Sequence, residues 1–155
     1  MRTFRSLGSD GRRLIFEAVV LPALVSLSFR LAGVARTQAL LRRLARAKPA
    51  LKDANGIVAS ARRAQRIVKK NFGIEGSCLT RSLTLWAMLL RRGVETDLRV
   101  GFRKNNGKLE GHAWVEYKDE PLNEGLGVRE AYSVFRDPAA FDALTRGTRP
   151  KRPPK

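Results

Sequence analysis

The chain has 155 residues, 43% of them hydrophobic, which is enough to bury the core of one domain. One cysteine and one histidine exclude an internal disulfide and a zinc site built from clustered Cys and His, and they favour a reducing cytoplasm. With 31 Lys and Arg against 14 Asp and Glu, the net charge of +17 attracts nucleic acid, anionic lipid headgroups or acidic peptides without selecting among them.

The basic residues are spread along the chain rather than gathered in one run, and no zinc-finger or RNP-type aromatic motif accompanies them. A solvated, arginine-rich surface therefore explains the charge as well as a binding function does. We expect no specific nucleic-acid partner, no metal and no cofactor, and the chain has no Gly-rich phosphate-binding loop.

The first predicted helix extends from Arg12 to about Val34 and contains the apolar run AVVLPALVSLSF, residues 18–29. We expect a bend at Pro22, since a proline inside a helix removes a hydrogen bond and crowds the preceding turn. The run has 12 residues whereas a bilayer span needs about 20, so a buried or interfacial helix is expected. Four arginines precede the run, at positions 2, 5, 12 and 13, and support a second hypothesis of peripheral contact with an anionic membrane.

Two further helices are predicted before the cysteine. A short one covers residues 37–47 with Thr37 as its N-cap, and residues 48–56 then interrupt the pattern. The next extends from about Ile57 to Lys70, where apolar and basic side chains occupy opposite faces. This spacing is typical of an amphipathic helix with one face to bury.

From Cys78 onward, apolar residues recur at helical spacing up to Gly93, which ends a helix. Between residues 96 and 103 the period changes to two, which is typical of a strand buried on one face. The segment KNNGK, residues 104–108, is a predicted turn, because its Asn-Gly pair suits positive backbone dihedral angles. The chain thus changes from helix to an antiparallel sheet.

The second predicted strand covers residues 109–117, and after another turn residues 122–124 are expected to start a third. The second strand carries on one face His112, Trp114 and Glu116. A short helix over residues 138–146 and a basic, proline-rich tail at 147–155, expected to be disordered, complete the chain.

Cys78 lies where a nucleophile would be useful. A thiol attacks an acyl carbon only as the thiolate, and the N-terminus of a helix stabilises an anion through its macrodipole and unpaired N–H groups. One such N–H aimed at an oxyanion is worth about 3 kcal/mol. His112, 34 residues later, is the expected proton partner, and Glu124, twelve residues further, is the expected carboxylate that orients the imidazole.

Each of these residues also has a simpler structural interpretation. An isolated cysteine in a helix is more often a core residue, and a lone histidine on a strand is commonly a hydrogen-bonded structural residue. Trp114 is most simply a core anchor. The order of helix start, strand and following acid is nevertheless the order that a papain-like mechanism requires, so we favour a cysteine nucleophile.

Five motifs are specific enough to suggest a family: CLTRSL at 78–83, LRRGV at 90–94, GFR at 101–103, HAWVE at 112–116 and the acid at Glu124. With them, the segment from 76 to 124 resembles the transglutaminase-like cysteine peptidases of lasso-peptide biosynthesis, related to the C-terminal domain of the microcin-processing protein. The close match covers about a third of the chain.

The resemblance implies an α+β fold with a papain/transglutaminase-like core, in which helices are followed by a small antiparallel sheet. We place an N-terminal helical region at 1–52, the peptidase domain at 53–146 and the tail at 147–155. The implied function is removal of the leader segment from a ribosomally made precursor, before a separate cyclase closes the macrolactam ring. The chain lacks the N-terminal winged-helix-like domain of fused versions, so it resembles the split form, in which a small leader-recognition protein delivers the precursor.

The implied catalytic residues are Cys78, His112 and Glu124, and the candidate substrate contacts are Arg81, Trp114 and Asn71, with Asn71 as a second oxyanion donor. Where the family usually has Asp, this chain has Glu124, which is longer by one methylene. The strand register must also bring it to the His112 face, which an odd loop or a bulge allows and a plain even loop does not. Asp119 and Glu116 are the alternative orienting acids.

A second functional hypothesis is a catalytically silent module of the same fold. Its basic helices would bind the precursor peptide, the cyclase or an anionic membrane surface.

Overall fold

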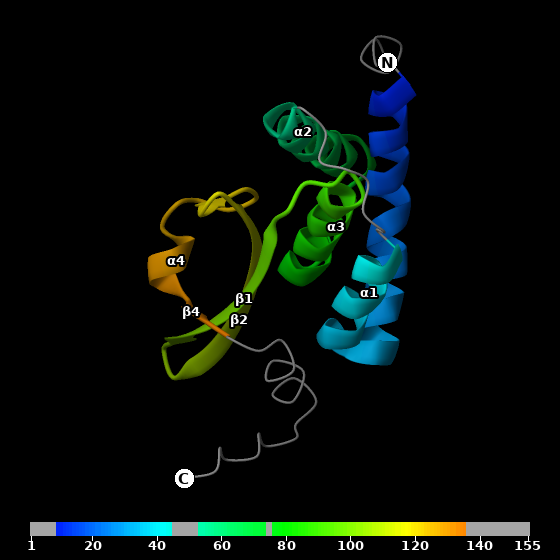
Figure 1. The fold of residues 1–155 in the computed structure, drawn as a ribbon. Coiled ribbons are helices and arrows are strands. Elements are labelled where there is room, and N and C mark those ends of the chain that lie inside the picture. The colour runs from blue at the N-terminus through cyan, green and yellow to red at the C-terminus, as the bar shows by residue number, and fades with distance from the viewer. Residues whose placement is uncertain (1–8, 45–52, 74–75, 136–155) are drawn as a thin grey trace.

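The structure, a computed structural model, describes residues 9–44, 53–73 and 76–135 (Figure 1). The elements in chain order are α1 (Ser9–Leu44), α2 (Ala54–Phe72), α3 (Cys78–Leu90), β1 (Asp97–Asn105), β2 (Lys108–Tyr117), β3 (Glu120–Pro121), α4 (Val128–Ala131) and β4 (Ser133–Val134). The strands form one antiparallel sheet in the order β3-β2-β1-β4, and α3 lies between this sheet and α1. The predicted α+β class, with helices preceding a small antiparallel sheet, is confirmed.

The predicted helix over 138–146 and the tail at 147–155 lie outside the described residues. The structure adds two short elements that were not predicted, α4 and β4, and β4 pairs with β1 at the edge of the sheet.

Helix α1 does not break at Pro22, where a bend was expected, but at Gly33, close to the expected end of the first helix at about Val34. Gly33, with φ 80° and ψ 175°, is the residue of α1 with a non-helical backbone, whereas Pro22 stays inside the helix. Glycine adopts a positive φ at no steric cost, so the chain turns there and the second helical segment starts before Thr37. Thr37 is therefore not a cap: its side chain is buried, and its hydroxyl hydrogen-bonds Ser28 Oγ at 3.1 Å.

The stretch Gly11–Leu44 of α1 is long and apolar enough to cross a membrane, by length and composition. The apolar run between Glu17 and Arg30 was expected to be too short for a bilayer span, but the helix continues on both sides of these charges. A core helix of a soluble protein passes the same test, and a third of the apolar window is buried here. Its length alone therefore does not assign α1 to a membrane.

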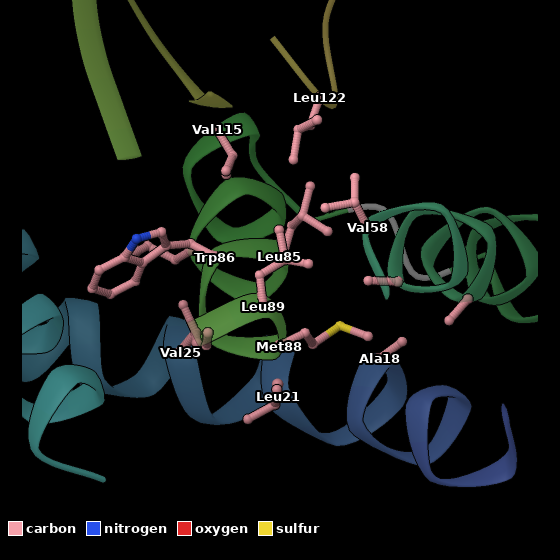
Figure 2. Close-up of a cluster of buried hydrophobic side chains, with 14 of the residues drawn as sticks. Ala18, Leu21, Val25, Val58, Leu85, Trp86, Met88, Leu89, Val115 and Leu122 are labelled. Atoms are coloured by element: carbon pink, nitrogen blue, oxygen red, sulfur yellow. The ribbon is translucent and has the colours of Figure 1, made fainter. Parts of the chain in front are cut away.

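The core forms around α3, because this helix is covered on nearly all sides. Figure 2 shows its side chains meeting those of α1 and α2 on one side and those of β2 and the following loop on the other. The labelled contributors are Ala18, Leu21 and Val25 of α1, Val58 of α2, Leu85, Trp86, Met88 and Leu89 of α3, Val115 of β2, and Leu122. Helix α1 thus supplies part of the same core that supports α3 and the sheet.

A buried ion pair joins α1 to the end of α3. The Glu17 carboxylate is only 8% exposed, and Arg92 Nη1 donates to its Oε2 at 2.7 Å. Arg13 and Arg91 lie 3.6 Å from the other carboxylate oxygen. A buried carboxylate with these partners fixes the position of α1 on the rest of the domain.

We expect Glu17→Gln to lower the free energy of unfolding by about 2 kcal/mol, because Arg92 loses its buried charged acceptor. Urea unfolding followed by circular dichroism measures the change. Glu95→Gln removes the same charge from an exposed position and serves as the control, with a change within about 0.5 kcal/mol. Equal effects of the two variants would mean that the pair contributes no stability.

The β1–β2 hairpin turns at Asn106 and Gly107, both with positive φ, as the Asn-Gly pair predicts. Near the turn, Arg103 Nε donates to Glu110 Oε2 at 2.8 Å. This hydrogen bond, aided by one from Asn105, lowers the pKa of Glu110 and raises the pKa of Arg103. The stabilisation is present above the unfolded pKa of Glu110 and is lost as the pH falls through the folded pKa; it is small because the pair is exposed.

Candidate active site

Cys78 is the first residue of α3 and its side chain is half-buried. Ser77 caps the helix: its Oγ accepts from the Thr80 N–H at 3.2 Å, and its carbonyl accepts from the Arg81 N–H at 3.0 Å. Within the described part of the chain, no acceptor binds the N–H groups of Cys78 and Leu79. The sulfur therefore lies beside two free backbone donors, which is the arrangement that stabilises an oxyanion.

The structure brings His112, Glu124 and Arg81 together. One carboxylate oxygen of Glu124, Oε1, lies 3.3 Å from His112 Nε2 and 3.2 Å from Arg81 Nη2. The side chains of His112 and Glu124 are 18% and 23% exposed, so both are accessible from solvent without being fully hydrated. One carboxylate oxygen of Glu124 thus lies against the His112 imidazole, and the Arg81 guanidinium holds the same oxygen.

The strand register alone would not produce this contact. The turn between β2 and β3 has an even number of residues, Lys118 and Asp119, both at positive φ. It pairs Glu116 with Pro121. Continuing that ladder would set Glu124 on the sheet face opposite to His112. Instead the ladder ends with the bond from the Leu122 N–H to the Val115 carbonyl, and the chain bends over residues 122–124, where a third strand was predicted. The bend thus brings Glu124 to the His112 face, as an odd loop or a bulge would have done.

Asn123 holds this bend in place. Its Oδ1 accepts from the Val115 N–H at 2.9 Å, where the Leu122 carbonyl would accept if the ladder continued, and its Nδ2 donates to Ser82 Oγ at 2.9 Å. The Ser82 hydroxyl, fully buried, in turn donates to the Ala113 carbonyl at 2.8 Å. This chain of bonds joins α3, β2 and the bend, and it determines where the next residue, Glu124, points.

Cys78 and His112 lie on neighbouring elements but are not hydrogen-bonded to each other in the described structure. Ser82, one turn after Cys78 on the same helix face, contacts Ala113, the residue after His112. These contacts set the start of α3 alongside the histidine segment of β2. Catalytic hydrogen bonds are often long in a substrate-free site and tighten when substrate binds.

An aromatic side chain that the sequence analysis missed covers the imidazole. The Tyr132 ring stacks on His112 with 5.0 Å between centroids, and the Arg103 guanidinium lies over the Tyr132 ring, 4.8 Å from its centroid. Gly101 permits this approach, since a Cβ there would lie 3.1 Å from Tyr132 Cβ. A glycine inside a strand pattern is a signal of close backbone approach, and it was the available clue.

Trp114 and the alternative acids have structural partners instead. Trp114 is fully buried and donates from Nε1 to Glu116 Oε1 at 2.9 Å, so it has no exposed surface to offer a substrate. Glu116 is 3% exposed and is paired with Arg99 and Arg129. Asp119 is 83% exposed in the turn, and its partner is also Arg129. Neither acid reaches His112.

Asn71 is not placed as an oxyanion donor. It lies exposed in the last turn of α2, and its Nδ2 donates to the Ile67 carbonyl at 2.8 Å, so its amide is held by its own helix. Among the described residues, no group of three His, Cys, Asp or Glu side chains is arranged to hold a metal ion.

A cleft of about 440 Å³ opens between the three helices and the bend. It includes Arg81 and Glu124 but neither Cys78 nor His112, so it adjoins the candidate site on the helical side of the Glu124 carboxylate. Its lining residues are Ala18, Pro22, Arg62, Gln65, Arg66, Val68, Lys69, Thr80, Arg81, Thr84, Leu122, Asn123, Glu124 and Gly125.

Residues 18–137 match the family model described as the transglutaminase-like superfamily. The matched range begins in α1 and includes Cys78, His112 and Glu124. No curated protein and no solved structure matches the chain.

Proposed function

Since the chain belongs to the transglutaminase-like superfamily, which includes cysteine peptidases, we propose that it is a cysteine peptidase with Cys78 as nucleophile, His112 as general acid and base, and Glu124 as the orienting acid. The observation that carries the proposal is the His112–Glu124 contact, held alongside the helix that begins with Cys78. Binding of the same carboxylate oxygen by Arg81 supports it, because the guanidinium holds Glu124 in position.

In the first half of the proposed reaction, the Cys78 thiolate attacks the scissile carbonyl carbon. The Cys78 N–H, and the adjacent free N–H of Leu79, donate to the oxyanion that forms. His112 gives its proton to the nitrogen of the departing peptide, the C–N bond breaks, and a thioester remains on the sulfur. Glu124 stabilises the imidazolium and selects the ring tautomer.

In the second half, neutral His112 takes a proton from a water molecule, whose oxygen attacks the thioester carbon. The C–S bond breaks, the acid product leaves, and the thiolate returns beside the imidazolium. The sum is hydrolysis of one peptide bond with no oxidant or metal involved.

The proposed substrate is a ribosomally made lasso-peptide precursor, from which the enzyme removes the leader. The support is the set of motifs around Cys78 and His112, CLTRSL and HAWVE. The proposed enzyme works with a leader-recognition protein and supplies the free amine that a macrolactam cyclase consumes. We place this function in the cytoplasm, where the single thiol stays reduced.

The experiment combines the full chain with a leader-recognition protein and a lasso-peptide precursor, and the products are identified by mass spectrometry. A single cleavage that yields leader and core supports the proposal. Cleavage by the recognition protein alone, or none with all components present, contradicts it.

A second candidate function is binding without catalysis, and the outer face of α1 favours it. Four large apolar side chains on this face are more than half exposed: Phe16, Leu24, Leu27 and Leu31. Exposed arginines border the stripe at Arg12, Arg13 and Arg30. An apolar stripe with flanking arginines is typical of a helix that lies on an anionic membrane surface.

On this basis we expect the full chain to co-sediment with vesicles containing phosphatidylglycerol and not with purely zwitterionic vesicles. The double variant Leu24→Glu/Leu27→Glu should reduce vesicle binding at least about tenfold, because two apolar side chains no longer enter the interface. Ala59→Glu/Ser60→Glu adds the same charge at exposed positions of α2 and should have a much smaller effect. Equal losses in both double variants would leave only the net charge as the cause of binding.

A further inference from the structure

The cleft on the helical side of Glu124 is strongly basic for its size. Arg62, Arg66 and Lys69 line it from one face of α2, and Arg81 lines it from α3. Glu124 is the carboxylate in the lining, and it is already bound to Arg81 and His112. Neither Arg62 nor Arg66 pairs with a carboxylate of the described residues. Like charges one helical turn apart repel each other, so an anion between them would relieve that repulsion.

A buried hydroxyl without a partner also lies in the cleft. Thr84 is 1% exposed, and its Oγ1 makes no hydrogen bond with any described residue. A buried polar atom left unpaired costs about 1–3 kcal/mol, so it needs an explanation. Since Thr84 lines the cleft, a ligand that enters it can supply the missing acceptor.

The other lining residues suit a peptide better than a small inorganic anion. Ala18 and Pro22 line the cleft from one turn of α1, and Pro22 has no N–H to give to the Ala18 carbonyl. Val68 and Leu122 add apolar surface. The volume of about 440 Å³ lies in the usual range of small-molecule sites and exceeds what one phosphate fills.

We propose that this cleft binds an acidic segment of the peptide substrate, with a carboxylate between Arg62 and Arg66 and a hydrogen bond from Thr84. The identity of the ligand as substrate rests on the proposed peptidase function, whereas the binding itself does not. Thr80 connects the two sites, because it lines the cleft and its hydroxyl hydrogen-bonds that of Ser77, the residue before Cys78. A peptide held in the cleft is therefore held close to the start of α3.

Binding is tested on the full chain carrying Cys78→Ala, with a capped tri-glutamate peptide and its tri-glutamine counterpart as probes. Calorimetry is done at about 0.15 M salt, where long-range attraction by the net charge is largely screened. The glutamate peptide should bind at least about tenfold more tightly, since Arg–carboxylate hydrogen bonds are charge-assisted. Equal binding of the two peptides would overturn the proposal.

The matched variants are Arg66→Gln and Arg63→Gln, which remove the same charge from neighbouring positions of α2. Arg66 lines the cleft and Arg63 does not. Arg66→Gln should weaken binding of the glutamate peptide at least about fivefold, and Arg63→Gln less than about twofold. Thr84→Val, which keeps the side-chain shape, should also weaken binding. Similar losses for Arg66→Gln and Arg63→Gln would show that the peptide responds to the overall positive charge and not to a site in the cleft.

Inorganic phosphate forms the third arm. If phosphate alone binds as tightly as the glutamate peptide and depends on Arg66, the assignment to a peptide is overturned. The binding experiments use the Cys78→Ala variant, so a failure to bind the peptide does not affect the cleavage experiment with the unmodified chain. Failed cleavage with intact peptide binding would contradict the proposed peptidase function alone. In the cleavage assay, Arg66→Gln should raise KM with little change in kcat.

Discussion

Cys78→Ala is expected to reduce precursor cleavage by at least about 10³-fold, because the variant has no atom that can form the thioester. Folding should be nearly unchanged, since the side chain is small and half-buried at the start of α3. Initial rates from mass spectrometry measure the loss, and calorimetry with the precursor shows whether binding persists. Loss of cleavage with retained binding separates the peptidase from a silent binding module.

Alkylation supplies an independent control for the same prediction. The chain has one cysteine, so iodoacetamide can modify a single thiol. The alkylated protein should lose cleavage in step with incorporation of the label. Full proteolysis after complete alkylation would exclude Cys78 as the nucleophile.

Glu124→Ala is expected to lower kcat/KM by at least about 10²-fold, because His112 loses the acceptor that selects its tautomer and Arg81 loses its partner. Glu124→Gln should lose less, since an amide oxygen still accepts a hydrogen bond from the imidazole, as the asparagine does in papain-like proteases. The loss should lie in kcat more than in KM, because the carboxylate acts on the imidazolium of the transition state. Steady-state kinetics with the precursor give both parameters.

Asp119→Ala is the matched control for Glu124→Ala. Asp119 lies in the turn before Glu124 and is 83% exposed, away from His112, so its removal should leave kcat/KM unchanged. A loss at Asp119 as large as that at Glu124 would contradict the assignment of the orienting acid.

The elements that the sequence predicts well are those whose signals are local. The amphipathic pattern predicted α2 from about Ile57 to Lys70, and the helix extends a few residues further at each end, between its cap Asp53 and its terminal glycine Gly73. The Asn-Gly pair determines the hairpin turn. The change of period from about four to two likewise separates α3 from β1.

The elements that differ are those with competing signals or with long-range partners. A bend in α1 was expected at Pro22, but the break lies at Gly33, because proline keeps a helical φ while glycine can adopt a positive one. The third strand was expected at residues 122–124, but Asn123 replaces the ladder there with side-chain bonds to Val115 and Ser82. Strand β4 is two residues long and has no periodic pattern to detect.

From the sequence alone come the helix that starts at Cys78, the strand face that carries His112, and the acid that follows, since side-chain direction repeats with a local period. The catalytic roles of these residues stay predictions. Only the tertiary structure decided that the bend brings Glu124 to His112, that Arg81 binds the same oxygen, that Trp114 is buried, and that Tyr132 covers the imidazole. These contacts join residues far apart in the chain. They depend on how the helices and strands pack against one another, and no local period in the sequence encodes that packing.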